Sequence, residues 1–185
     1  MAKRIDEYIR DYVVFDLETT GTSTKKDKIV EISALRVRNG KVIEEFSSLV
    51  NPKCPIPYYA TRVNNITDDM VADAPAIEEI LPKFIEFVGK DVMLGQNIQC
   101  FDLKYIHRDC GLYGFEFMDN DFIDTLPIAR ACLPKLSHHT LSDLADFFDI
   151  STDGAHRALA DCYMTHRVYE AMGSMIESAF ASILK

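Results

Sequence analysis

Asp16 and Glu18 stand two residues apart after a short apolar run, and this pair constrains the fold more than any other feature of the chain. The run Tyr12–Phe15 predicts a buried β-strand, and alternation along a strand sends residues 16 and 18 to the same face. Two carboxylates this close beside a core repel each other, and keeping both ionised costs free energy unless a cation lies between them. Alone, the pair fits equally well a strand edge that runs into a polar turn. Acidic residues elsewhere in the sequence are needed to distinguish a metal-binding pair from a strand edge.

Two further carboxylates follow patterns that bring them to the same region. Val92–Leu94 predicts a short buried strand, and the apolar spacing after it predicts a helix near 98–109 with Asp102 in its first or second turn. His156 comes before, or at the start of, a long helical pattern near 157–182, and Asp161 lies within its first turns. Separately, Asp102 fits a helix surface, and Asp161 fits an acidic first-turn residue favoured by the helix dipole.

Together, the three segments resemble the DEDD exonuclease superfamily in its histidine-bearing branch, like the proofreading subunit and proofreading domains of bacterial replicative DNA polymerases. The first motif, Asp-x-Glu-Thr-Thr-Gly, stands at 16–21; the second, an Asn followed by Phe-Asp, is Asn97 with Phe101-Asp102; the third, His-x-Ala-x-x-Asp, runs from His156 to Asp161. The resemblance covers roughly residues 11–172. It implies an α/β fold with a ribonuclease-H-like mixed sheet flanked by helices, and removal of nucleotides from 3′ ends with two divalent metal ions.

The resemblance also indicates where the substrate would bind. Residues 63–67 are similar to the family's Gly-Ile-Thr element, whose Ile wedges against the terminal base, but Asn65 replaces the usual Gly. Asn tolerates a positive φ, so the turn can survive. Ile66 fits equally well a core position ahead of a helix capped by Thr67 or Asp68. The expected substrate contacts are Thr19, Thr20, Gly21, Ile66, Asn97 and Phe101.

The chemistry expected of these residues is phosphodiester hydrolysis. Four converging carboxylates with hard oxygen ligands suit Mg²⁺ or Mn²⁺, two ions per site. We expect Asp16 to bridge the ions, Glu18 and Asp161 to complete the ion that holds the attacking water, and Asp102 to support the ion at the leaving 3′ oxygen. His156 is expected to be the base, because histidine titrates near neutral pH.

His138 and His139 form a second histidine-bearing feature. They precede Thr140, which is expected to cap a short helix near 140–148, and the adjacent pair is interpreted as a solvated loop rather than as a ligand pair. The resemblance leaves a substrate contact in this segment open.

Length and composition predict one α/β domain over residues 1–185, with 1–10 as an N-terminal extension. An Asn39-Gly40 hairpin signal suggests that the first three strands form an antiparallel meander. The expected strands lie near 12–17, 28–38, 41–50, 91–94 and 121–123, and further helices near 67–72, 76–88 and 125–132. No apolar stretch of membrane-spanning length and no secretory leader is present, so no membrane partner and a cytoplasmic location are expected. Five cysteines without a C-x-x-C pair are expected to be reduced thiols.

Net charge limits the class of partner. With 20 Lys and Arg against 29 Asp and Glu, the chain carries −9, which argues against a protein that grips long stretches of nucleic acid. It fits the enzyme that the resemblance implies, which handles the 3′ end of a single DNA strand and releases a nucleotide monophosphate. A polymerase or helicase partner would supply further affinity, and three forms stay open: a free-standing enzyme, a subunit bound to a DNA polymerase, and a domain of a longer chain. Two alternatives stay open: an exoribonuclease that uses the same site, and a catalytically silent binding module. Loss of a metal ligand would indicate the second, and all four carboxylates are present.

Overall fold

The computed structural model describes residues 2–181 and contains a five-stranded mixed sheet in the order β3-β2-β1-β4-β5. The strands β1 (Tyr12–Thr19), β2 (Ile29–Arg38) and β3 (Lys41–Leu49) pair antiparallel, whereas β4 (Met93–Gly95) and β5 (Phe122–Asp124) continue the sheet in parallel with β1. The predicted meander and the mixed α/β sheet are therefore confirmed. The β2–β3 turn has positive φ at Asn39 and Gly40, as the hairpin signal requires.

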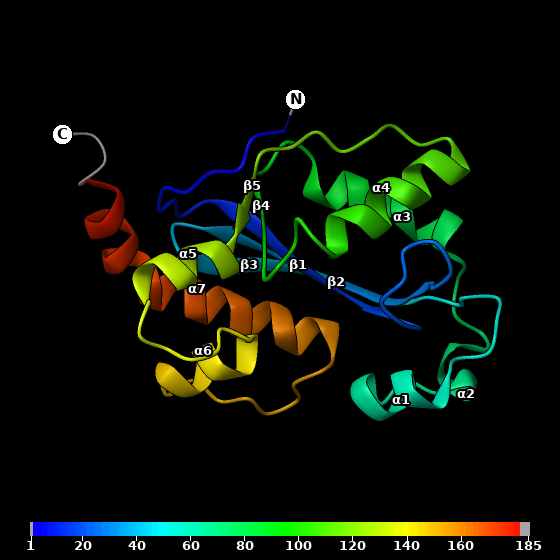
Figure 1. Cartoon of the computed structure of the whole chain (residues 1–185). Helices are drawn as coiled ribbons and strands as arrows, with labels where there is room; N and C mark the ends of the chain where they lie inside the picture. The colour runs from blue at the N-terminus through cyan, green and yellow to red at the C-terminus, as the bar shows by residue number, and fades with distance from the viewer. Residues whose placement is uncertain (1, 182–185) are drawn as a thin grey trace.

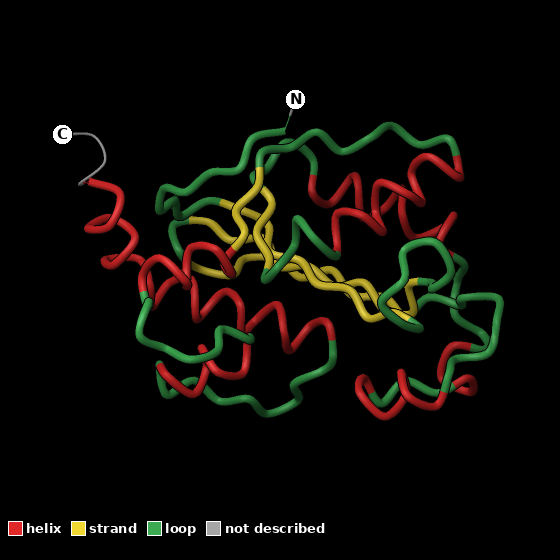
Figure 2. Tube along the Cα trace, in the orientation of Figure 1, coloured by secondary structure: helices red, strands yellow, loops and turns green. Residues whose placement is uncertain are grey.

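Helices cover both faces of this sheet, so β1 is buried in the middle of the molecule (Figures 1 and 2). On one face, α3 (Ile77–Val88) and α4 (Asp102–Tyr113) pack with Phe15 and Phe84 in the core. On the other face, α5 (Thr125–Cys132), α6 (Leu141–Phe147) and α7 (Ala158–Ala181) pack around Val14 and Tyr169. The short helices α1 (Tyr58–Asn64) and α2 (Asp68–Val71) lie at one end of the sheet with their own small apolar cluster.

Two helices differ from the expectation. The sequence pattern missed α1, because seven residues between Pro57 and Asn65 are too few to show a helical period, although Asn65 ends the helix in the left-handed conformation (φ 59°). Helix α4 begins at Asp102, four residues later than the expected 98. The carboxylate of Asp124 explains the delay, since it accepts hydrogen bonds from the backbone N–H groups of Asn97 and Gln99 and holds this segment as a loop.

The N-terminal segment packs along the edge of the sheet. The backbone N–H of Ile5 donates to the carbonyl of Phe122 in β5, and Tyr8 lies against Tyr169 with ring centroids 5.4 Å apart. Gly173 makes room for the Tyr8 ring, because a Cβ there would lie 2.9 Å from it.

All five cysteines lie in the described part of the chain and are free thiols, of which Cys110 and Cys162 are buried. Within residues 2–181, no helix is both long enough and apolar enough to cross a membrane. The last residue of the expected closing helix, 182, lies outside the described residues.

Replacing Phe84 by Ala is expected to lower the free energy of unfolding by about 3–5 kcal/mol, because the ring is fully buried between Phe15 and Phe46 and its loss leaves a cavity. Phe117→Ala is the matched control, since that side chain is 59% exposed and should cost less than about 1 kcal/mol. Urea unfolding measures both. Equal losses in the two variants would contradict this description of the core.

Candidate metal centre and active site

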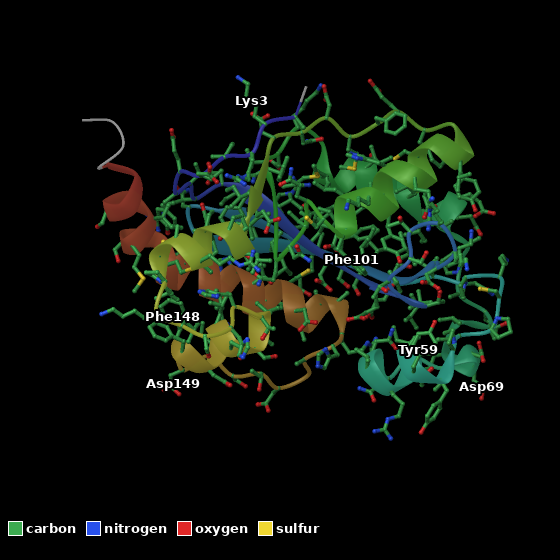
Figure 3. All side chains as sticks on the ribbon, viewed as in Figure 1. Lys3, Tyr59, Asp69, Phe101, Phe148 and Asp149 are labelled. Atoms are coloured by element: carbon green, nitrogen blue, oxygen red, sulfur yellow. The ribbon has the colours of Figure 1, made fainter. Side chains whose placement is uncertain are left out.

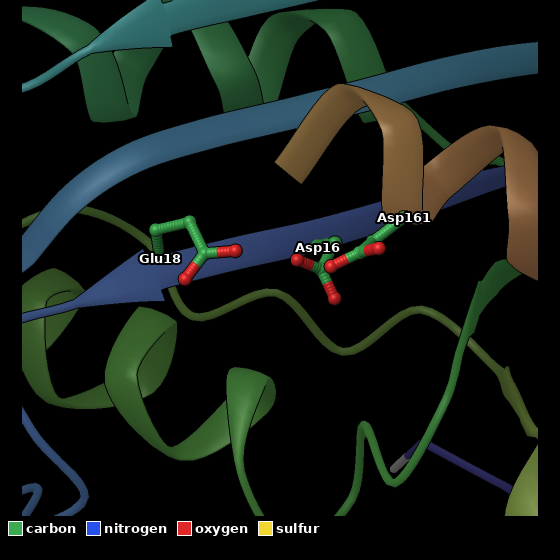
Figure 4. Close-up of side chains that lie close together, drawn as sticks. All are labelled: Asp16, Glu18 and Asp161. Atoms are coloured by element: carbon green, nitrogen blue, oxygen red, sulfur yellow. The ribbon is translucent and has the colours of Figure 1, made fainter. Parts of the chain in front are cut away.

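Three carboxylates meet where the end of β1 faces the start of α7. Asp16 and Glu18 project from the same face of β1, as strand alternation predicts, and Asp161 approaches from the first turn of α7 (Figure 4). One carboxylate oxygen from each of the three lies within 4.8 Å of the other two. Cys162, fully buried beside this cluster, donates to the carbonyl of Ser33 on β2 at 3.3 Å and so holds the helix close to the sheet.

Asp102 borders this cluster without joining the group of three. It is the first residue of α4 and only 3% exposed, and its Oδ1 accepts a hydrogen bond from the backbone N–H of Leu17 at 3.2 Å. Leu17 is the residue between Asp16 and Glu18. The helix therefore brings the fourth carboxylate to the strand that carries the first two, with one of its oxygens committed to the strand backbone.

His156 lies at the edge of the site in an exposed loop just before α7. Its backbone is left-handed (φ 66°), and its N–H donates to both carboxylate oxygens of Asp161 at 3.3 and 3.2 Å. This contact also orients Asp161 toward β1. The sequence prediction that the histidine and Asp161 flank the same helix start is confirmed by these bonds, whereas the role of the imidazole stays a prediction.

Burial and mutual repulsion raise the pKa of every carboxyl in the site. Burial raises the pKa of Asp16 well above its usual value, and the charges of Asp102, Asp161 and Glu18 add to the effect. Burial, with Asp161 and Glu31 nearby, raises the pKa of Glu18 to about 8. Burial raises the pKa of Asp102 to about 7, and that of Asp161 to about 6 against the opposing effect of His156.

Burial and repulsion of this kind disfavour full ionisation of the cluster at neutral pH unless a positive charge lies beside it. The donors are carboxylate oxygens only, which are hard ligands of the kind that Mg²⁺, Mn²⁺ and Ca²⁺ prefer, and no thiolate or imidazole belongs to the group of three. The residues present therefore fit a divalent metal ion.

Glu31 is a functional residue that the sequence reasoning missed. It pairs directly with Glu18 between β2 and β1 and is 3% exposed. Its carboxylate accepts from Nη2 and Nε of Arg157, at 2.6 and 3.1 Å, and from the backbone N–H of Ala158 at 3.0 Å. Because Arg157 and Ala158 lie between His156 and Asp161, this contact fixes the start of α7. The sequence does contain an indication of this role, because Glu31 is an acidic residue inside the apolar run 29–35.

A cavity of about 480 Å³ opens beside Glu18. The exposed side chains of Tyr59 and Val63 on α1 form one wall of it, and Phe101 from the loop before α4 forms another (Figure 3). Asn64 joins α1 to the strand, because its Nδ2 donates to the carbonyl of Thr19 at 3.3 Å. The remaining lining residues are Leu17, Thr19, Gly21, Thr22, Asp27 and Ala60.

Of the six predicted substrate contacts, three line this cavity and three do not. Thr19, Gly21 and Phe101 line the cavity. Thr20 does not, and its hydroxyl instead accepts a hydrogen bond from the backbone N–H of Lys28, at 2.9 Å, in the turn to β2. Ile66 needs a correction: it has no exposed surface and packs in the core of the α1–α2 unit, so the apolar surface offered to a ligand comes from Tyr59 and Val63.

Asn97 belongs to a separate cavity. It lies with Gln96 at the start of the loop that leads from β4 to α4, whereas Phe101 stands at the end of the same loop. The two ends of this loop therefore line two different cavities.

Comparison with known proteins agrees with the geometry. Residues 13–169 match the family model described as "Exonuclease". The chain is 41% identical to a DNA polymerase III of the PolC type from Clostridium perfringens over 158 residues, which cover 85% of this chain but only 11% of that polymerase. It is 36% identical to the DNA polymerase III subunit epsilon of Aquifex aeolicus, over 85% of this chain and 78% of that subunit. The zinc-bound complex of E. coli exonuclease I with single-stranded DNA superposes with a TM-score of 0.85 at 21% identity, over 96% of this chain and 43% of that one.

In the metal-free protein, the free energy of unfolding is expected to fall as the pH rises from about 4 to about 8. Over this range the folded state keeps protons on Glu18, Asp102 and Asp161 that the unfolded chain releases near pH 4, so the folded state binds more protons. Urea unfolding in EDTA at pH 5 and pH 8.5 measures the difference, and Mn²⁺ should offset it at pH 8.5. Glu18→Gln should flatten the profile. Stability that rises with pH in EDTA would contradict the electrostatics described.

Arg157→Ala is expected to weaken Mn²⁺ binding. The substitution removes the hydrogen bonds to Glu31 that hold the start of α7, so the position of Asp161 relative to β1 is no longer fixed. Arg157→Lys should restore part of the affinity, since it keeps the charge but not the forked geometry. Arg167→Ala, at an exposed position on the same helix, is the matched control. Calorimetric titration with Mn²⁺ measures all three. Equal affinities in the Arg157→Ala and Arg167→Ala variants would remove the positioning role.

Proposed function

The chain belongs to the exonuclease family, and from this premise we propose that it removes nucleotides from the 3′ ends of single-stranded DNA by hydrolysis. The observation that carries the proposal is the group Asp16, Glu18 and Asp161 beside a cavity with aromatic and apolar walls. The named functions of two relatives support DNA as the substrate, because both are parts of DNA polymerase III. The PolC-type relative is far longer than this chain, so its polymerase partner is part of the proposal only.

The metal ligands in this proposal are Asp16, Glu18 and Asp161, with Asp102 as a fourth. Mg²⁺ or Mn²⁺, two ions per site, fits hard carboxylate ligands. When bound, such ions stabilise charge on the entering and leaving oxygens of phosphoryl transfer. The protein positions the ligands through the β1 backbone, through the Leu17 contact to Asp102 and through the Glu31–Arg157 anchor of α7.

His156 is proposed as the general base that takes the proton from the attacking water. The residue is exposed, and its own backbone N–H holds Asp161. A neutral imidazole has a free acceptor nitrogen, whereas the carboxylates in this scheme are committed to metal.

Tyr59, Val63 and Phe101 are proposed to hold the bases at the strand end. Aromatic and apolar side chains stack on bases without regard to sequence, and an unpaired end offers both faces of its bases. Glu18 and Asp27 in the same cavity disfavour a second phosphate close to the bases, so binding should depend on the terminal nucleotide rather than on a long track of phosphates. The released product is a nucleotide monophosphate, and a cytoplasmic location stays a prediction.

Asp16→Ala is expected to lower hydrolysis by at least about 10³-fold, because it removes a ligand from the centre of the carboxylate group. Asp146→Ala, at an exposed position on α6, is the matched control and should keep full activity. The measurement uses end-labelled single-stranded DNA, mismatched duplex and RNA of equal length, with Mg²⁺, Mn²⁺ or EDTA. Activity in EDTA would contradict the assignment of the carboxylates as metal ligands. Faster trimming of RNA than of DNA would make RNA the preferred substrate. A wild-type protein without activity on any of these substrates would indicate a binding module.

His156→Ala is expected to reduce turnover by about 10²- to 10⁴-fold, the range for loss of a general base. Metal affinity should stay close to that of the wild type, because the imidazole is not proposed as a ligand. Single-turnover hydrolysis and calorimetric titration with Mn²⁺ read the two quantities separately. If one ion were lost from the variant, the residue would have to be reassigned as a ligand.

A further inference from the structure

A second cavity, of about 500 Å³, lies on the other side of the loop that joins β4 to α4, and no carboxylate lines it. The cavity beside Glu18, by contrast, does include acids. The lining of the second cavity offers amides, hydroxyls, imidazoles and one guanidinium. The residues of this polar cleft are Gln96, Asn97, Leu126, Arg130, Ser137, His138, His139, Thr140 and Leu141.

Hydrogen bonds hold the walls of the polar cleft in place. Nε2 of Gln96 donates to the backbone carbonyl of His139 at 2.8 Å, which joins the β4–α4 loop to the segment before α6. The hydroxyl of Thr125 donates to the other end of the Gln96 amide. The ring of His139 contacts the carbonyl of Leu133 at 3.0 Å. The cleft is therefore a shaped surface rather than a loose loop.

Some of the donors that face this cleft already have partners, such as the Gln96 amide and the His139 ring, whereas others are free to bind a ligand. Arg130 and His138 are exposed, and within residues 2–181 the Arg130 guanidinium has no hydrogen bond or ion pair. Two carboxylates border the lining, and both are engaged by backbone N–H groups. Asp124 accepts from Asn97 and Leu126 at 3.0 and 3.1 Å, and Asp143 accepts from Thr140 at 2.9 Å as part of the cap of α6. The free donors thus form a site suited to an anion.

One short loop contributes residues both to the polar cleft and to the proposed catalytic site. Gln96 and Asn97 line the cleft, Phe101 lines the cavity beside Glu18, and Asp102 follows directly. Asn97 has a left-handed backbone (φ 58°), fixed by the bond from its N–H to Asp124 at 3.0 Å. A strand whose terminal base lies at Phe101 can therefore continue across this loop into the cleft.

We propose that the polar cleft binds a backbone phosphate of the single-stranded DNA substrate, on the 5′ side of the nucleotide that is removed. This inference rests on the proposed function. Arg130 presents a planar fork that matches phosphate oxygens, and the His138 ring and Ser137 hydroxyl add donors at the same surface. A contact to a backbone phosphate holds the strand without selecting its sequence.

The test compares binding and chemistry on substrates of different length. Affinity for oligothymidylates of two to ten nucleotides is measured with Ca²⁺ in place of the catalytic ion, across a salt series, for wild type, Arg130→Ala and His138→Ala. We expect Arg130→Ala to weaken binding of the ten-nucleotide strand by about 5- to 10-fold and that of the dinucleotide by less than about twofold. The slope of log affinity against log salt should become less negative by about 0.7, the value for one phosphate.

Arg167→Ala is the control for the loss of one positive charge. Arg167 lies four residues after Tyr163, whose hydroxyl contacts Glu45 on β3, at the opposite edge of the sheet from β4 and β5. This variant should change neither the affinity nor the salt slope by more than a small, length-independent amount. If Arg130→Ala behaved like Arg167→Ala, or weakened the dinucleotide as much as the longer strand, the polar cleft would not be a phosphate site.

Hydrolysis of the p-nitrophenyl ester of thymidine 5′-monophosphate separates this inference from the proposed function. The single phosphate of that small substrate is the one that is cleaved, so it has no second phosphate for the cleft, and Arg130→Ala should leave its hydrolysis unchanged. A wild type that cleaves neither the ester nor DNA with Mg²⁺ or Mn²⁺ would overturn the proposed function. The Ca²⁺ binding series would still decide whether the cleft holds a phosphate.

Discussion

Repulsion among buried carboxylates is the constraint on which this structure depends. Asp16 lies at the centre of it, with Glu18 on the same strand, Asp161 on α7 and Asp102 on α4, and burial raises the pKa of each group. A fold that collects these charges gives up stability unless a cation joins them. The packed layers on both sides of β1 supply the apolar burial that offsets this cost, and the affinity for metal follows from the same unfavourable arrangement.

The structure controls this repulsion with hydrogen bonds that hold ligands without neutralising them. Leu17 donates to Asp102, His156 donates to Asp161, and the Arg157–Ala158 segment donates to Glu31. Three of these donors, Leu17, His156 and Ala158, are backbone N–H groups. The ligand geometry is therefore built into the strand and the helix start, and a ligand cannot turn away unless the backbone also moves.

The distribution of charge matters more to function than the net value of −9. Acidic side chains gather where a cation can bind, whereas the polar cleft beyond the β4–α4 loop has no carboxylate in its lining. An acidic protein can bind an anionic strand when its acids are held at the metal site and a few donors face the phosphates. Such binding is local, which suits a reaction at a strand end.

The sequence by itself determined the sheet, the carboxylate motifs and their meeting at β1, because strand alternation and helical spacing are local properties. It did not reveal α1, the later start of α4 or the buried position of Ile66, since these depend on Pro57, on the Asp124 carboxylate and on packing against Val30 and Ile56. Only the tertiary structure decided that Glu31 anchors α7, that Tyr59 and Val63 present the apolar wall, and that Gln96 and Arg130 share a cleft. Each of these depends on contacts between residues far apart in the chain, which no local pattern records.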